Sequence, residues 1–527
     1  KNDVAGRLQL QFQPAENWDA RLVARGSESR NSGPRGRPAT TFYNADGLAY
    51  ALPDDQDVWG TGIGNNPAGY RYRGSDPWAG AFDQNNPLTL SQWGAAAHLT
   101  GYFGPWTLFS ISDYSHFKHL YREDTDLGPT RGLEYAATTG IAQFSQELRA
   151  QYDSDALKVI GGAYYLNIDG KYRNEFLVRT PFVGITAPAT IVGPEGTASL
   201  MDWRLRTTSY SAYGQADWSL LPTLKLTLGA RWTRDQKHDL LQSDQVPLRT
   251  GQDVLSLSDP GLVTLLNYDN HRSDSFWSWK GGLNWTPTER VLVFASVTRG
   301  QKGGGYNVPF FGSNPDTISF RPEELTSYEA GVKWSPGSIV RKLNASFFHY
   351  DYKDYQAFEF INGVGAIFNI DAAIDGGEAD ITLTPIEPLT VQLGSAFIFD
   401  AKVKNVGLPS ARQVDTRVPQ TPGLSMTALV RYDWTLASGT VSAQADGRYQ
   451  SSQYFDAFNS PINREPGYGV ANLRLFYTVA DKRWSTSLYV ENLSNTVYRT
   501  FALDLGGVAQ QWLGVPRTFG IQAHYRF

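Results

Sequence analysis

Phe519-Gly520-Ile521-Gln522-Ala523-His524-Tyr525-Arg526-Phe527 ends the chain as a segment in which apolar and polar residues alternate without a break. A period of two is typical of a β-strand whose two sides meet different surroundings. One such strand would also suit a soluble β-sandwich. The same pattern recurs about nineteen times along the chain, however, with no helical segment between the repeats. This repetition predicts an all-β protein.

Internal segments indicate what lies on the two sides of these strands. In 224–233 the residues Leu, Leu, Leu, Ala and Trp alternate with Lys, Thr, Gly, Arg and Thr, and 328–334 has the same form. A dry core would have to bury Lys225, Arg231 and Lys333, which is costly for charged groups. A polar face that lines a water-filled lumen fits better, so we expect a transmembrane antiparallel β-barrel.

Composition agrees with this class and excludes others. The 527 residues contain no cysteine, which excludes disulfides and thiol chemistry, and the net charge of −5 gives no reason to expect a nucleic-acid partner. Mean hydropathy is −0.37, and no run approaches the ~18 apolar residues of a membrane helix. Both values are also expected of a barrel, because half of each strand faces water.

The connections between the expected strands alternate between short and long. Short turns with Pro, Gly, Asn or Asp are expected at 14–17, 103–105, 153–155, 221–223, 287–289, 335–337, 385–388, 433–439 and 480–483. Between them we expect loops of roughly 10 to 55 residues, the longest near 31–87. Short turns at one end and long loops at the other are typical of outer-membrane barrels. The irregular spacing of the turns argues against a propeller with blades of about 40–50 residues.

Tryptophan gathers beside the short turns. Seven of the 15 tryptophans lie within a few residues of one: Trp18, Trp106, Trp218, Trp285, Trp334, Trp434 and Trp484. Aromatic side chains collect at membrane–water interfaces because the ring is apolar and its polar group needs a partner. We therefore expect an aromatic girdle at the turn end.

The strand count predicts that the sheet is incomplete within residues 1–527. About nineteen strands is an odd number, and the first segment runs inward from the loop end to the turn at Pro14. An open sheet edge in lipid leaves backbone groups unpaired, and bacterial single-chain barrels have an even number of strands. Roughly three further strands would give 22.

Four motifs resemble those of one family. They are Val297-Thr298-Arg299-Gly300-Gln301-Lys302-Gly303-Gly304-Gly305-Tyr306-Asn307, Pro322-Glu323-Glu324-Leu325-Thr326-Ser327-Tyr328-Glu329-Ala330-Gly331-Val332-Lys333, Val490-Glu491-Asn492-Leu493-Ser494-Asn495-Thr496-Val497-Tyr498 and Pro516-Arg517-Thr518-Phe519-Gly520. In this order they resemble the TonB-dependent outer-membrane receptors. Residues 1–296 share only the strand-and-loop architecture with them.

The resemblance implies a 22-stranded barrel filled by an amino-terminal plug, and active import across the outer membrane of a Gram-negative bacterium. Residues 1–527 are expected to be barrel alone, with the plug, the TonB-binding segment and the first strands in preceding sequence. The implied partners are TonB, outer-membrane lipid and lipopolysaccharide, and a small nutrient. An iron–siderophore complex is the default cargo, ahead of cobalamin, a saccharide or an aromatic compound.

Aromatic residues in the loops are the candidate ligand contacts, because they offer large contact areas with little entropy to lose. These candidates are Trp59, Tyr70, Tyr72, Trp78, Tyr306, Phe310 and Phe311. Lumen-facing Lys225, Arg231 and Lys333 would attract an anionic ferric complex.

Other chemistries fit less well, and we predict no catalytic residue, no cofactor and no metal site. Gly60–Gly64 and Gly303–Gly305 do not link a strand to a helix, as phosphate-binding loops do. His116 and His119 would lie on opposite faces of a strand, and Asp54, Asp55 and Asp57 fit a solvated loop better than a Ca²⁺ site. No histidine has the context of a Ser–His–Asp hydrolase. A passive porin or diffusion channel is the remaining alternative.

Overall fold

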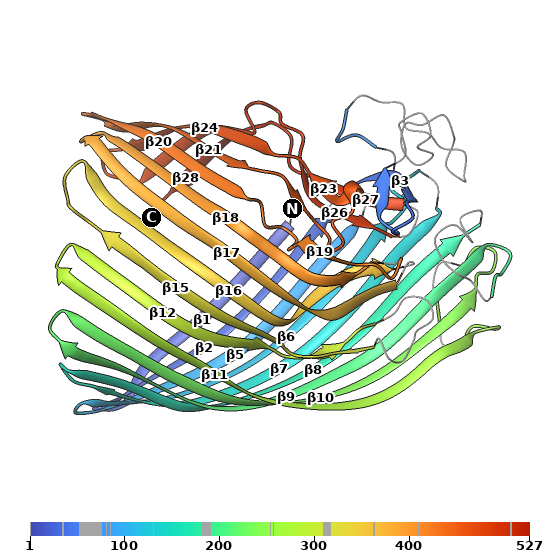
Figure 1. Cartoon of the computed structure of the whole chain (residues 1–527), viewed down its shortest axis with the longest axis horizontal. Helices are drawn as coiled ribbons and strands as arrows, with labels where there is room; N and C mark the ends of the chain where they lie inside the picture. The colour runs from blue at the N-terminus through green and yellow to red at the C-terminus, as the bar shows by residue number, and fades with distance from the viewer. Residues whose placement is uncertain are drawn as a thin grey trace.

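The computed structural model describes residues 2–33, 36–51, 76–80, 82–84, 86–129, 131–180, 191–252, 255–256, 258–308, 318–361, 364–408, 410–505 and 508–526. Its main feature is an antiparallel sheet of 20 strands that curls into a barrel-shaped wall (Figure 1). The one short strand among the 20 is β19 (Gln413–Arg417), which pairs only with β18, so nineteen strands form the wall. This confirms the expected all-β class and the expected number of strands.

The wall strands are β1 (Asn2–Ala15), β2 (Trp18–Ser32), β5 (Pro87–Phe103), β6 (Trp106–Asp124), β7 (Leu133–Asp153), β8 (Leu157–Arg179), β9 (Gly196–Leu221), β10 (Leu224–Pro247), β11 (Val263–Thr288), β12 (Val291–Lys302), β15 (Glu323–Trp334), β16 (Val340–Ile361), β17 (Val364–Ile386), β18 (Leu389–Gly407), β20 (Leu424–Leu436), β21 (Gly439–Gln450), β24 (Tyr468–Val479), β25 (Trp484–Glu491) and β28 (Thr518–Tyr525). The short elements at the loop end are β3 (Gly36–Tyr43), β4 (Ala49–Ala51), β13 (Gly305–Tyr306), β14 (Ser319–Phe320), β22 (Gln453–Tyr454), η2 (Pro461–Asn463), β23 (Arg464–Glu465), β26 (Arg499–Asp504) and β27 (Val508–Leu513).

The alternating pattern is turned inside out relative to a soluble protein. Along β24, exposure alternates residue by residue, and the more exposed positions include Leu473, Leu475 and Tyr477. Asn472 and Arg474 lie on the less exposed face. Exposed apolar side chains in a continuous band mark a surface that meets an apolar partner. The sheet therefore has the outer and inner faces that a membrane barrel needs.

All nine short turns lie where the sequence predicts them, between successive wall strands at the left of Figure 1. One prediction about the opposite end is wrong. The connection between β16 and β17 is only residues 362–363, because these two strands stay paired from Leu383 opposite Val340 up to Ile361 opposite Val364. Long strands thus replace one of the expected long loops.

Two levels of tryptophan border the apolar band. Six of the seven predicted girdle residues are exposed large side chains, the exception being Trp18. A second level contains Trp93 and Trp277. Trp277 and Trp285 lie on the same strand, β11. Their spacing of eight residues gives about 20 Å at a rise of ~3.3 Å per residue and a tilt of ~40°. This is close to the ~25 Å apolar band of outer-membrane barrels.

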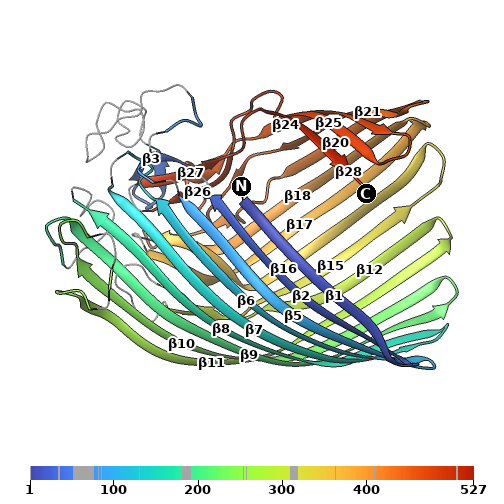
Figure 2. The same ribbon diagram turned by 180° about the vertical axis from the view of Figure 1, so that it is seen from behind.

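The sheet has two free edges. Over the described residues, β1 pairs only with β2 and β28 pairs only with β25. All 14 residues of β1 are exposed, and Phe519 and Ile521 of β28 are exposed as well. Figure 2 shows both edge strands from behind.

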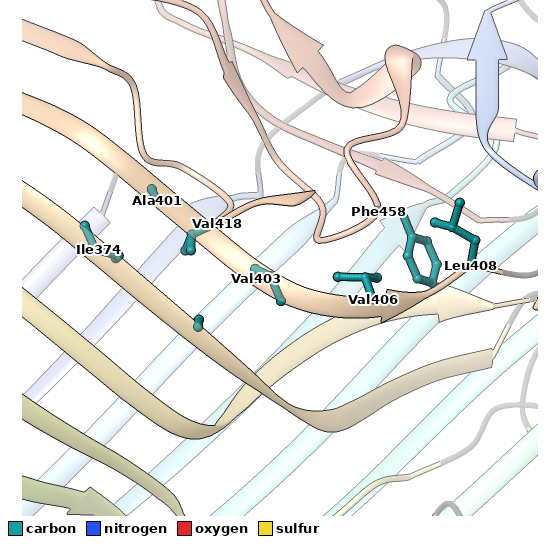
Figure 3. Close-up of a cluster of buried hydrophobic side chains, with 8 residues drawn as sticks. Ile374, Ala401, Val403, Val406, Leu408, Val418 and Phe458 are labelled. Atoms are coloured by element: carbon teal, nitrogen blue, oxygen red, sulfur yellow. The ribbon is translucent and has the colours of Figure 1, made fainter. Parts of the chain in front are cut away.

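Tight apolar packing is found at the loop end rather than inside the wall. One such cluster, of eight buried residues among those described, joins β17 and β18 to the segment that contains Phe458 (Figure 3). Val403 and Val406 are fully buried there, and Phe368 stacks on Phe458 with the ring centroids 6.3 Å apart. This cluster fixes the loops of the carboxy-terminal half against the wall. None of the described residues forms a helix long and apolar enough to cross a membrane.

Candidate functional site

The loop end carries a second small sheet that joins distant parts of the chain. Strands β26, β27, β3 and β4 are hydrogen-bonded in that order, so the last long loop pairs with the first one. Gln510 of β27 also donates from Nε2 to the carbonyl of Thr125, at 2.7 Å, and to Glu123 Oε1, at 2.8 Å. These contacts hold the mouth of the wall in one arrangement. The sequence predicts a long loop near 31–87, and the structure adds that this loop contains the two short strands β3 and β4.

A cavity of about 320 Å³ lies between this small sheet, the end of β16 and the 455–463 segment. Its lining combines the carboxyl groups of Glu359, Asp456 and Asp504 with the aromatic rings of Tyr43, Phe358, Phe455, Phe458 and Phe501. Such a lining could enclose a flat or positively charged group.

The three carboxyl groups also accept hydrogen bonds, Asp456 within its own segment and Glu359 and Asp504 from other segments. Asp456 accepts hydrogen bonds from the backbone N–H of Ser460, at 3.0 Å, and from Asn463 Nδ2, at 2.9 Å. Glu359 accepts a hydrogen bond from the backbone N–H of Ala457. Burial raises the pKa of Asp456 to about 6, and burial together with the nearby Asp456 raises the pKa of Glu359 well above its usual range.

Asp504 completes the cavity from the opposite side. It accepts hydrogen bonds from Thr41 Oγ1, at 3.0 Å, and from the Tyr43 hydroxyl, at 2.5 Å. Thr41 and Tyr43 belong to β3, so Asp504 joins the first long loop to the last.

A buried ion pair anchors the neighbouring segment. Arg499 Nε lies 2.6 Å from Glu465 Oε2, and both side chains are largely shielded from solvent. Arg499 also donates to the backbone carbonyls of Ile462, at 2.7 Å, and Arg464. A guanidinium with several acceptors in fixed positions is the geometry in which a buried charge is tolerated.

Two of the seven predicted ligand residues lie in the described part of the chain. Trp78 is half-buried and donates a hydrogen bond from its indole nitrogen to the carbonyl of Gly514, at 2.7 Å. Its polar group therefore links its own loop to the loop that contains Gly514. Tyr306 lies in β13, opposite Ser319 of β14. Its hydroxyl is buried and has no hydrogen-bond partner within the described ranges. Burial and the charge of Asp239 raise the pKa of Tyr306 to about 12.

The other five predicted contacts lie outside the described residues: Trp59, Tyr70, Tyr72, Phe310 and Phe311. The same holds for the glycines of 60–64 and for Asp54, Asp55 and Asp57. Their role in ligand capture therefore stays a prediction.

The wall itself encloses a polar cavity of about 660 Å³ on its inner face. Lys280, Glu329, Lys333 and Asp380 contribute to its lining, which confirms that Lys333 lies on the lumen side. The predicted basic lining is partly neutralised, because Lys225 Nζ lies 3.4 Å from Asp217 Oδ2.

Arg231 adds a different kind of contact on the same face. It donates to Ser211 Oγ at 2.6 Å, and its guanidinium lies over the rings of Tyr164 and Tyr213. These partners are neutral, so Arg231 keeps its positive charge on the lumen side, whereas Lys225 is paired with a carboxylate.

Two rejected motifs behave as expected. His116 stacks on Trp93 on the outer face, whereas His119 stacks between Phe117 and Tyr121 on the opposite face. Gly303 to Gly305 link β12 to β13, so no helix follows them.

Sequence reasoning missed the acidic cavity because its members are far apart in the chain. Glu359 ends a wall strand, Asp456 sits in a loop, and Asp504 ends β26. The only local signal is the run of Asp, Asn and Ser residues between 456 and 463, which is typical of side chains that bond to nearby backbone.

Comparisons with known proteins match this architecture. The family model described as TonB dependent receptor-like, beta-barrel covers residues 3–493. The catecholate siderophore receptor Fiu of Escherichia coli K12 is 26% identical over 267 residues, which are 49% of this chain and 34% of that protein. The pesticin receptor of Yersinia pestis is 23% identical over 389 residues, 72% of this chain and 51% of its own. The chain thus spans between one third and one half of the length of these relatives.

Solved structures show the same fold at low identity. The ferric yersiniabactin uptake receptor FyuA from Yersinia pestis superimposes with a TM-score of 0.74 at 18% identity and covers 100% of this chain and 71% of its own. The closed form of Fiu gives a TM-score of 0.69 at 16% identity, over 100% of this chain and 74% of its own.

Proposed function

The chain belongs to the family of TonB-dependent receptor-like β-barrels, and from this premise we propose that it forms the wall of an active transporter in the outer membrane of a Gram-negative bacterium. The exposed apolar band, the two tryptophan levels and the polar inner face support this location. The family is one of receptors rather than enzymes, which supports a function without catalysis.

The cargo in this proposal is a ferric siderophore. The observation that carries it is the family match over 3–493 together with relatives named for siderophores: a catecholate siderophore receptor and a ferric yersiniabactin uptake receptor. Cobalamin, saccharide and aromatic cargo, and passive diffusion through an open channel, stay as alternatives that no specific observation favours.

We propose that energy coupling uses parts that lie outside residues 1–527. We propose that further strands fill the space between the free edges of β28 and β1, since unpaired backbone in lipid costs several kcal/mol for each group. A plug domain with a TonB-binding segment completes the transporter in this proposal. Intact-mass measurement of the purified protein should then exceed the 58.5 kDa of this chain. A mass equal to this chain alone would contradict the proposal.

Ligand capture is proposed for the aromatic residues of the loop end, Trp59, Tyr70, Tyr72, Trp78, Tyr306, Phe310 and Phe311. The buried Tyr306 hydroxyl, which has no hydrogen-bond partner among the described residues, supports a role for its segment, because a polar ligand that reaches it can complete the hydrogen bond. Replacing all seven residues with alanine should lower ligand binding at the cell surface. Unchanged binding by a variant with normal surface expression would exclude these residues.

Expression and growth under iron limitation test the cargo. We expect iron starvation to induce the gene strongly, and a deletion strain to lose growth on one class of ferric siderophore while it still grows on iron supplied through other routes. Complementation with the full gene should restore growth. Induction only by a sugar or an aromatic compound would overturn the siderophore assignment.

A further inference from the structure

A cluster of three potential metal ligands lies on the outer surface of the β10–β11 hairpin, and the proposed transport function does not use it. His238 and His271 occupy directly opposite positions on the two strands, and Asp269 lies two residues from His271. One ligand atom from each residue can be chosen so that all three lie within 4.8 Å of one another.

The distances between the ligand atoms are close to those that a bound metal ion requires. His238 Nε2 lies 2.8 Å from Asp269 Oδ1, and His271 Nε2 lies 3.6 Å from the same oxygen. Tetrahedral coordination with bonds of ~2.0–2.1 Å places neighbouring ligand atoms about 3.3–3.4 Å apart. On metal binding, the distance from His238 Nε2 to Asp269 Oδ1 must therefore increase by about half an ångström, and the distance from His271 Nε2 to the same oxygen must decrease slightly. Rotation of the side chains can supply both changes.

The backbone already brings the two imidazoles together. Their ring centroids are 3.9 Å apart with an interplanar angle of 15°. Two charged rings so close would repel each other, whereas neutral rings that share a cation are held in place. Arg206 lies opposite His238 on the neighbouring strand β9. Its Nε atom lies 3.8 Å from Asp169 Oδ1, so its guanidinium is paired with that carboxylate.

The cluster is accessible from outside the lumen. On β10 and β11 it shares its face with Leu228 and Trp277, which are strongly exposed. His271 lies six residues beyond Trp277 on β11, or about 15 Å above that level at ~3.3 Å per residue and a tilt of ~40°. The pairing of β11 with β12 begins only at Trp279, so among the described residues this part of β11 pairs with β10 alone. The hairpin extends from the wall (Figure 1).

We propose that His238, His271 and Asp269 bind one divalent transition-metal ion on the outer surface of the wall. Two imidazoles and a carboxylate suit Zn²⁺, Cu²⁺ or Ni²⁺, whereas Ca²⁺ and Mg²⁺ prefer sites made of oxygen atoms alone. Three protein ligands leave one position open for water or for an external oxygen donor.

Zn²⁺ titration of the purified full protein tests the site, by calorimetry without a histidine tag and in a buffer that does not chelate metals. We expect one saturable site whose affinity falls by about tenfold or more in His238→Gln and in His271→Gln. His349→Gln is the matched control, because His349 also bonds a carboxylate, Asp375, at 2.7 Å on the outer face but has no second imidazole in a described metal cluster. This control should keep the wild-type affinity.

Co²⁺ absorption gives a second readout that does not depend on heats of binding. Bound Co²⁺ should show visible bands that disappear in His271→Gln, and millimolar Ca²⁺ should not displace it. The absence of saturable binding would overturn the proposal, as would equal affinity in the wild type and both cluster variants. Equal weakening by His349→Gln would overturn it as well. Gel mobility before and after heating confirms that each variant is assembled.

Discussion

Arginine in place of Leu228 should test which face of the wall meets lipid. Leu228 is 54% exposed and lies midway between the tryptophan levels, four residues from Leu224, which pairs with Trp285, and four from Trp232, which pairs with Trp277. A cation at the middle of the bilayer costs about 2–4 kcal/mol on the lipid face of a barrel. The folding equilibrium constant should therefore fall about 30- to 900-fold.

Ser296→Arg is the matched control, with the same charge at nearly the same height on the opposite face. Ser296 pairs with Gly282 and Glu329 and contributes to the polar inner cavity, so a cation there keeps water and a carboxylate nearby. We expect Ser296→Arg to change the free energy of unfolding by less than about 1 kcal/mol. Denaturant unfolding in lipid vesicles, followed by tryptophan fluorescence, measures both variants. Equal costs, or a larger cost for Ser296→Arg, would refute the assignment of the faces.

Three further predictions concern the loop end. Trp78→Phe keeps the ring but loses the hydrogen bond to Gly514, so amide exchange in both loops should accelerate by an amount that corresponds to about 1 kcal/mol. The pKa of Asp456 is raised to about 6, so its contribution to the stability of the fold is complete below about pH 4 and is lost as the pH rises through 6. Amide exchange around Asp456, corrected for intrinsic rates, should therefore be slower at pH 5 than at pH 7.5. Arg499→Met leaves the buried carboxylate of Glu465 unpaired, so the free energy of unfolding measured with denaturant should fall by about 3–5 kcal/mol. A fall of less than about 1 kcal/mol would exclude a buried ion pair.

The wall could be predicted from the sequence because its determinants are local. Alternation identifies each strand, and turn residues such as those at 221–223 mark where one strand ends and the next begins. Sequential antiparallel pairing then requires no long-range information. The extension of β16 and β17 up to Ile361 opposite Val364 was missed because a long loop was expected at this end, although residues 357–361 and 364–368 are mostly apolar.

The loop end could not be predicted, since its contacts join residues that are far apart in the chain. Strand β3 pairs with β27, with Thr40 opposite Val508. His238 and His271 meet only because the register of β10 and β11 places them opposite each other. Seen in the sequence, each is a lone histidine in a polar stretch, and a register shift of one residue would place the two rings on opposite faces.

Uptake of radioactive iron, presented as a ferric siderophore to cells that carry the full gene, tests the central claim most directly. We predict saturable uptake that is lost in a strain without TonB, while binding of the complex to the cell surface persists. Uptake that continues at the same rate without TonB would contradict the account and indicate a passive channel, and so would the failure of every ferric siderophore to enter.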